Sequence, residues 1–180
     1  MTLHVDNAGS TGRDLYVLPL DGDLTPEPFL ATPFQERGLS FSPDGGWVAY
    51  VSDESGLDEV YVRPYPGPAG QVIISTAGGE EVVWGPDGSE LFYRKGEDLM
   101  RVAVTTGETF SAETPRLLFA APFALGTPGG GFGNPNYDSA PDGKQFIFVE
   151  QDSPTGGQGA AQINVVLNWF EELSARVPIP

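Results

Sequence analysis

The tripeptide Pro-Asp-Gly occurs three times, at residues 43–45, 86–88 and 141–143, and each copy is followed by an apolar, aromatic stretch. Proline presets φ at the first turn position and glycine accepts a positive φ, so each copy predicts a tight turn between two strands. The successive prolines are 43 and 55 residues apart. This spacing is typical of a four-stranded β-propeller blade, with an insertion in the last repeat.

Two further elements recur with the same period. A strand that follows an aspartate recurs at residues 14–19, 58–64 and 98–102, and a weaker outer strand recurs at residues 28–31, 71–75 and 116–119. We therefore expect an all-β fold of four-stranded antiparallel blades, with three strands before Pro33, four in residues 37–75, four in residues 80–119 and three in residues 137–169. That makes about 3.5 blades, short of the 4 to 8 of a closed ring. Their approximate bounds are residues 1–32, 33–76, 77–120 and 121–180, and helix is expected only at residues 168–176.

Strand direction predicts that the three Pro-Asp-Gly turns lie on one rim and the loop at residues 53–58 on the opposite rim. Large side chains recur at equivalent strand positions, as packing between blades requires. The expected core residues are Trp47, Trp84, Phe92, Tyr93, Phe146 and Phe148.

Composition restricts the classes of function. The chain has 180 residues, 39% of them apolar, which suits one domain with a real core. Its net charge of -16 disfavours nucleic acid as a partner, because an anionic surface repels phosphates. Cysteine is absent from the sequence, so disulfides, thiolate catalysis and cysteine-ligated metals are excluded. We find neither a secretory signal nor an apolar run long enough for a spanning helix, and we expect no membrane insertion.

Residues 41–53, 58–66, 84–93 and 137–149 resemble the Pro-Asp repeat of TolB-like propellers. More narrowly, residues 18–22, 50–56 and 165–170 resemble the C-terminal propeller half of bacterial proteins that carry an N-terminal Ser/Thr kinase domain. The resemblance implies a sensor or scaffold that is frequently extracytoplasmic, in the periplasm or at the cell surface. It carries no kinase activity here, since the Gly-rich loop, His-Arg-Asp and Asp-Phe-Gly motifs are all missing from the sequence.

Catalytic residue types are scarce. His4 is the only histidine, and the sequence contains no Gly-x-Ser-x-Gly elbow. One imidazole without thiolates is also a poor zinc ligand set. We therefore expect a protein that is not an enzyme and needs neither cofactor nor metal, with His4 on an edge strand of the first blade.

Two loops are the candidate binding elements. Asp53, Glu54 and Asp58 place three carboxylates within six residues, which allows either a calcium site or a turn stabilised by side-chain hydrogen bonds; the turn is favoured because the alternating ligands of a calcium loop are missing. The Gly-rich stretch at residues 121–137 interrupts the repeat and is either a functional loop or disordered. Phe132 and Asn134 are its expected contact residues.

These features favour a non-catalytic module that binds a protein or peptide through the loops at residues 53–58, 75–81 and 121–136. The incomplete strand count leaves open blade ends at residues 2–5 and 162–169, and open ends invite association. We expect a homo-oligomer, or completion by the remainder of a longer propeller. The alternatives are a sensor or accessory propeller of a kinase or peptidase, and a hydrolase or lyase.

Overall fold

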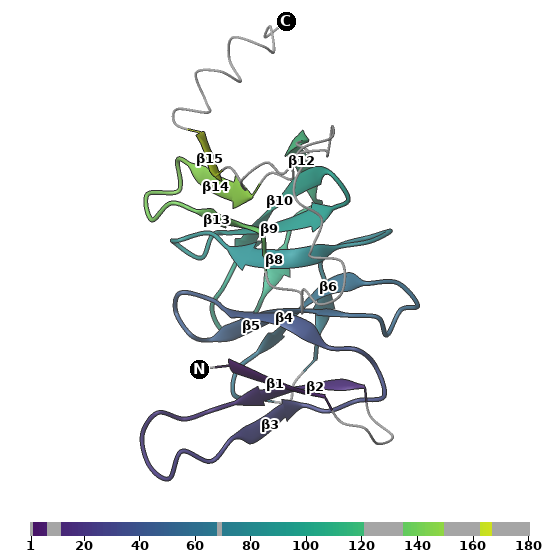
Figure 1. Cartoon of the computed structure of the whole chain (residues 1–180), viewed down its shortest axis with the longest axis vertical. Coiled ribbons are helices and arrows are strands. Elements are labelled where there is room, and N and C mark those ends of the chain that lie inside the picture. Colours follow the sequence, from purple (N-terminus) through teal and green to yellow (C-terminus); the bar gives the residue numbers. More distant parts are fainter. Residues whose placement is uncertain (1, 7–11, 68–69, 121–134, 150–162, 167–180) are drawn as a thin grey trace, which may run out of the picture.

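The computed structural model describes residues 2–6, 12–67, 70–120, 135–149 and 163–166, and every regular element in these residues is a β-strand (Figure 1). In this part of the chain no helix is long and apolar enough to cross a membrane. The expected helix at residues 168–176 lies outside the described residues. The strands are β1 (Thr2–Asp6), β2 (Arg13–Val17), β3 (Glu27–Leu30), β4 (Arg37–Phe41), β5 (Trp47–Ser52), β6 (Glu59–Pro64), β7 (Val72–Ile73), β8 (Glu80–Trp84), β9 (Glu90–Lys95), β10 (Asp98–Thr105), β11 (Ser111–Ala112), β12 (Arg116–Ala120), β13 (Tyr137–Ser139), β14 (Phe146–Val149) and β15 (Ile163–Val166).

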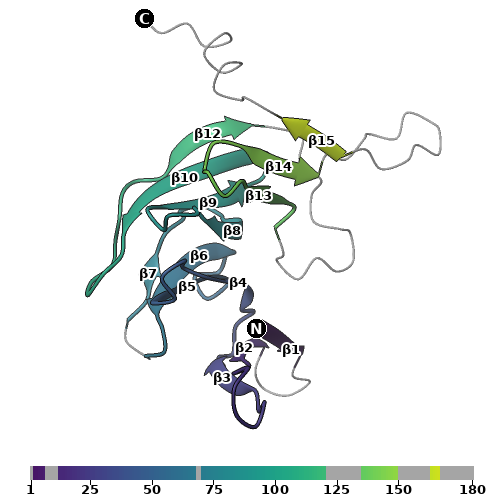
Figure 2. The same cartoon turned by 90° about the vertical axis from the view of Figure 1, so that its left-hand side faces the viewer.

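The strands form four separate antiparallel sheets, stacked along an arc (Figure 2). Blade 1 has the order β1-β2-β3, blade 2 the order β4-β5-β6-β7 and blade 4 the order β13-β14-β15. In blade 3, β8, β9 and β10 are followed by an outer edge in two pieces, because β11 and β12 both pair with β10. The expected all-β fold of antiparallel propeller blades is confirmed. We expected four strands in residues 80–119, and the structure has five. The prediction missed the fifth because the sequence shows no break that divides the outer strand into two pieces.

The Pro-Asp-Gly turns join β4 to β5, β8 to β9 and β13 to β14, and they lie on the rim opposite the loop at residues 53–58 (Figure 1). Gly45, Gly88 and Gly143 have φ of 71°, 74° and 68°, as the turn requires. Each of these glycines donates its backbone N–H to the backbone carbonyl of the residue three positions earlier. The predicted placement is confirmed, and we call this side the turn rim.

Successive turns also contact each other along the turn rim. A Cβ built on Gly88 would lie 3.4 Å from Cδ of Pro43, and one built on Gly143 would lie 3.8 Å from Cγ of Pro86. Gly88 and Gly143 are therefore packed against the proline of the preceding blade, whereas a Cβ built on Gly45 would meet nothing within 4 Å. The Pro-Asp-Gly repeat shapes the hairpins and also helps to set the spacing of the blades.

Alternation of side chains along the second strand of each blade builds two separate cores. Ala49 and Val51 on β5 face blade 3, where Leu91 and Tyr93 on β9 meet them in one buried cluster. The intervening residue Phe92 faces the other way and joins a second cluster with blade 4. The expected core aromatics are at most 9% exposed, apart from the half-buried Phe146, which packs beside Phe92.

We predict that Gly88→Ala lowers the free energy of unfolding by about 1–2 kcal/mol, because an L residue is strained at this φ and the new methyl group would crowd Pro43. Gly46→Ala is the matched control. Its φ is not positive and its Cβ would make only an ordinary contact at 3.6 Å with the Asp44 carboxylate. Urea denaturation followed by circular dichroism measures both variants; equal stability of the two would contradict the role of the turn.

Candidate functional site

The rim opposite the turns gathers the loop at residues 53–58 and the connection at residues 75–81, which we together call the loop face. The backbone N–H of Gly79 donates to the carbonyl of Asp58 over 2.8 Å. Arg37, the first residue of β4, forms an ion pair with Asp58 and lies 4.0 Å from the carboxylate of Glu80. The loop face is thus a joined surface of blades 2 and 3, as the sequence predicts for these two loops.

The three predicted carboxylates in residues 53–58 point to three different partners. Asp53 accepts the backbone N–H of Gln35 over 2.9 Å, which ties the loop to the connection from blade 1. Glu54 accepts a hydrogen bond from the side-chain amide of Gln71, whereas Asp58 is held by Arg37. These three carboxylates do not converge on one point, and the interpretation as a hydrogen-bonded turn fits the geometry.

The described residues contain no other assembled site for a cation or for catalysis. Within them, no group of three His, Cys, Asp or Glu side chains is placed to hold a metal ion. His4 lies on β1, an edge strand of blade 1, opposite Leu15 of β2. Phe132 and Asn134, the predicted contact residues of the Gly-rich loop, lie outside the described residues.

A buried polar network connects the loop face to blade 4. Glu81 on β8 and Arg94 on β9 are 3% and 2% exposed, and Arg94 Nε lies 3.3 Å from Glu81 Oε2. The backbone N–H of Asn136 donates to the same carboxylate oxygen over 3.1 Å. The Tyr137 hydroxyl donates to the Glu81 carbonyl over 2.6 Å. These bonds fix the start of β13 against blade 3.

Glu81 carries both backbone strain and an electrostatic cost. Its φ is 54°, in the left-handed region that side chains other than glycine rarely adopt. Gly38 holds the corresponding place in blade 2, with a φ of 64° at the bulge between β4 and β5. Burial raises the pKa of the Glu81 carboxyl, and the hydrogen bond from Asn136 and the charge of Arg94 oppose that rise. Strain of this kind persists only where the surroundings hold it in place, here through the contacts to blade 4.

A second buried acid lies at the junction of blades 1 and 2. Glu36 is 1% exposed, its carboxylate accepts a hydrogen bond from Thr32, and its backbone N–H donates to the Arg13 carbonyl over 3.1 Å. Burial raises the pKa of Glu36 to about 7, and the negative charges of Asp14 and Asp53 add to the rise. Glu36 therefore titrates near neutral pH, well above an ordinary carboxyl group.

Sequence reasoning missed these buried charges, although one of them leaves a visible signal. Arg94 occupies the register position that Val51 holds in blade 2 and Val149 holds in blade 4. A single charge in an apolar column of an aligned repeat indicates a paired, buried group. Glu36 and Glu81 stand beside other acidic or polar residues, so nothing in the local pattern separates them from surface carboxylates.

We predict that stability falls as pH rises from about 4.5 to about 7 because of Glu36. Its pKa is higher in the folded chain than its ordinary value of 4.5, so the contribution is fully present below pH 4.5 and is lost as pH rises through 7. Glu36→Gln is expected to flatten this part of the profile and to raise the unfolding free energy at pH 8 by up to about 3 kcal/mol. Chemical denaturation across this pH range tests it, with the exposed Glu97→Gln as control; an unchanged profile in Glu36→Gln would contradict the assignment.

In sequence, no protein-family model and no curated protein matches the chain. Among solved structures it is similar to TolB from Acinetobacter baumannii, with 14% identity, a TM-score of 0.49, and coverage of 93% of this chain and 53% of that one. It is also similar to oligogalacturonate lyase from Vibrio parahaemolyticus, with 14% identity, a TM-score of 0.47, and coverage of 83% of this chain and 35% of that one.

The chain thus spans about half of the TolB chain and about a third of the lyase chain. The kinase-associated part of the resemblance seen in the sequence repeats stays a prediction. Its own sheet topology and blade packing identify this chain as a series of antiparallel β-propeller blades.

Proposed function

We propose that this chain is a non-catalytic propeller module that binds protein or peptide partners and assembles through its open blade ends. The observation that carries the proposal is an exposed apolar face on blade 4. Ile147 and Val149 on β14 are 46% and 44% exposed. The corresponding strand of the other blades contributes buried core residues instead.

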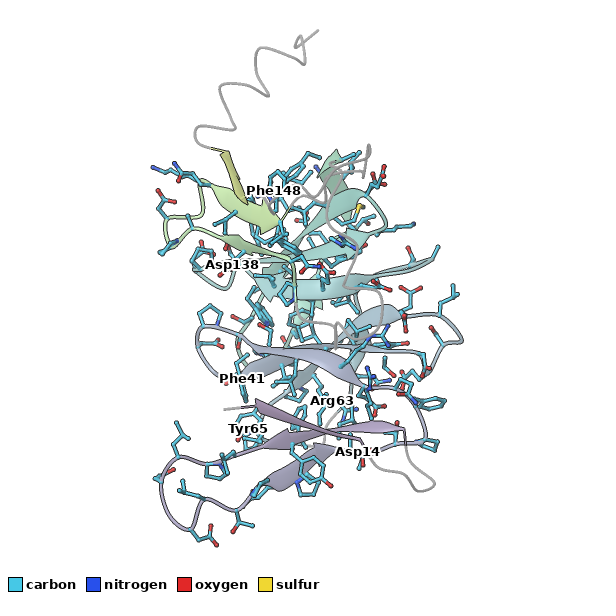
Figure 3. The ribbon with its side chains drawn as sticks, viewed as in Figure 1. Asp14, Phe41, Arg63, Tyr65, Asp138 and Phe148 are labelled. Carbon is cyan, nitrogen blue, oxygen red and sulfur yellow. The ribbon has the colours of Figure 1, made fainter. Side chains whose placement is uncertain are left out.

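The aligned positions in the preceding blades are buried. Ile147 corresponds to Ala49 and Phe92, which are 0% and 4% exposed, and each packs on the blade that follows. Phe148, between the two exposed residues, faces blade 3 and is 9% exposed (Figure 3). Ile147 and Val149 therefore lie on the face where a following blade would pack.

We assign a second copy of this chain to that face. Blade-to-blade packing already occurs at three junctions in one molecule, so a blade of the same repeat offers the matching shape and the matching apolar side chains. Blade 1 supplies the opposite end of the array, with β1 as an unpaired edge among the described strands. Two copies would bring eight blades together, counting the three-stranded sheets at the ends, within the range of closed propellers; an arrangement that does not close would give an open series.

The loop face is the proposed surface for a protein or peptide partner. It joins two blades into one surface and presents the exposed Glu80 beside the partly exposed Asp58. The net charge of the chain, -16, favours a partner with basic groups. In this arrangement the blades provide a rigid support, and the loops between them provide the contacts.

We predict that the purified chain sediments as a dimer or a larger species at micromolar concentration. Ile147→Asp together with Val149→Asp should shift it to a 19.2 kDa monomer, because two buried carboxylates would oppose packing of a following blade. Leu57→Asp is the matched control, since Leu57 is 58% exposed but lies at the tip of the loop at residues 53–58. A folded, monomeric parent chain in sedimentation velocity and circular dichroism would overturn the assembly proposal.

We also predict that a broad hydrolase and lyase screen shows no activity that His4→Ala removes. The sequence supplies a single histidine, and in the described part of the chain that residue lies on an edge strand. The comparison uses parent and His4→Ala protein at equal concentration. An activity present in the parent and lost in the variant would favour the hydrolase or lyase alternative instead.

A further inference from the structure

Blade 3 contains a hairpin that blades 1, 2 and 4 do not show in the described residues. β10 is eight residues long, whereas its counterparts β2 and β6 have five and six. The extension turns at residues 106–110 and returns as β11, and Figure 2 shows it reaching from blade 3 toward blade 2. The hairpin is thus an addition to the repeat rather than part of it.

Two contacts attach this hairpin to the turn rim of blade 2. The ring of Phe110 lies 5.2 Å from that of Trp47 and 6.5 Å from that of Trp84, which places it between the two blades. Thr106 at the hairpin tip lies near Asp44 in the Pro-Asp-Gly turn and, after the larger effect of Ser42, helps to lower the pKa of its carboxyl group. Both contacts fix the tip of the hairpin over blade 2.

The hairpin and the turn rim of blade 2 border an open cavity of about 630 Å³, within the size range of small-ligand sites. The third wall comes from the segment after β6, where Tyr65 packs edge to face on Phe41 with ring centroids 4.9 Å apart (Figure 3). The lining includes three aromatic residues and two carboxylates, beside glycines and small side chains. The residues that carry the argument are Asp44, Trp47, Tyr65, Glu108 and Phe110.

The charges of this cavity have one sign. Asp44 and Glu108 are its charged lining residues, and no lysine or arginine of the described residues lines it. Hydrogen bonds from Ser42 and the backbone of Gly46 lower the pKa of Asp44, so its carboxylate is ionised at neutral pH. A cation is therefore the complementary ligand, and the half-buried rings of Tyr65 and Phe110 offer π faces to it.

We propose that this cavity binds the basic side chain of a peptide, with arginine favoured over lysine. A guanidinium group is planar, stacks on aromatic rings and pairs with a carboxylate, whereas its alkyl stem suits the apolar part of the wall. The site lies on the turn rim, away from the loop face and the open face of blade 4. It therefore does not depend on the assembly proposed above.

The test compares two small probes that differ in charge. Nα-acetyl-arginine methylamide is titrated into the ¹⁵N-labelled chain, and the citrulline counterpart, neutral and nearly the same in shape, is titrated in parallel. We expect saturable shifts of the Trp47 indole and of the Gly107 and Thr109 amides with arginine. Citrulline should bind about tenfold more weakly, since it lacks both the cation–π and the ion-pair contributions. Equal shifts with the two probes, or no saturable shift with arginine, would overturn the proposal.

Variants of the same hairpin locate the binding. Glu108→Gln is expected to weaken arginine binding about threefold, as for loss of one exposed ion pair, while Glu113→Gln leaves it unchanged. Both glutamates are exposed, and each substitution removes one negative charge, but only Glu108 lines the cavity. Equal weakening in the two variants would show attraction to the overall negative charge and would contradict a site. Oligomeric state is measured on the same samples, so failure of assembly and failure of binding are distinguished.

Discussion

Packing of each blade against the next through alternate side chains of its second strand is the interaction on which the rest of the structure depends. On β9, Leu91 and Tyr93 face blade 2, and Phe92 and Arg94 lie toward blade 4. One strand thereby serves two cores, and every blade gains stability from its neighbours rather than from itself alone. Among the described residues, blades 2 and 3 have a neighbour on both faces, whereas Ile147 and Val149 of blade 4 stay exposed.

Polar contacts fix how neighbouring blades are oriented on each other. Two apolar faces alone allow one blade to slide over the next, whereas a hydrogen bond to one backbone carbonyl fixes a single position of the two blades. Trp84 donates its indole N–H to the Ser40 carbonyl over 3.1 Å, and Tyr137 does the same toward Glu81 over 2.6 Å. Both bonds cross from one blade to the preceding one. The Glu81–Arg94 ion pair lies within blade 3, and the backbone N–H of Asn136 links its carboxylate to blade 4; removal of either partner would leave a buried charge.

The sequence was sufficient to predict the blades, because the sequence signals that specify them are local. Turn glycines, alternating apolar residues and the repeat period each act within a few residues, and the strands after the Pro-Asp-Gly turns lie where these signals place them. The site was less predictable. The carboxylates of Asp53 and Asp58 bind Gln35 and Arg37, which precede them by 18 and 21 residues, so these partners cannot be recognised from the local sequence. The hairpin around Phe110 also escaped prediction, because its fixation on Trp47 is a tertiary contact between blades.

The additions to the repeat give the two rims different chemistry. On the loop face, Glu59 accepts the hydroxyl of Ser75 and the backbone N–H of Gly78, and Asp58 is paired with Arg37, which leaves the exposed Glu80 for a partner. On the turn rim, no basic side chain of the described residues lines the same cavity as the carboxylates beside Phe110. An acidic group that is already paired stabilises the fold, whereas one that lines an aromatic cavity without a cation is available to a ligand. Because this cavity lies between blades 2 and 3, and the open face belongs to blade 4, a second copy could complete the array without covering the cavity.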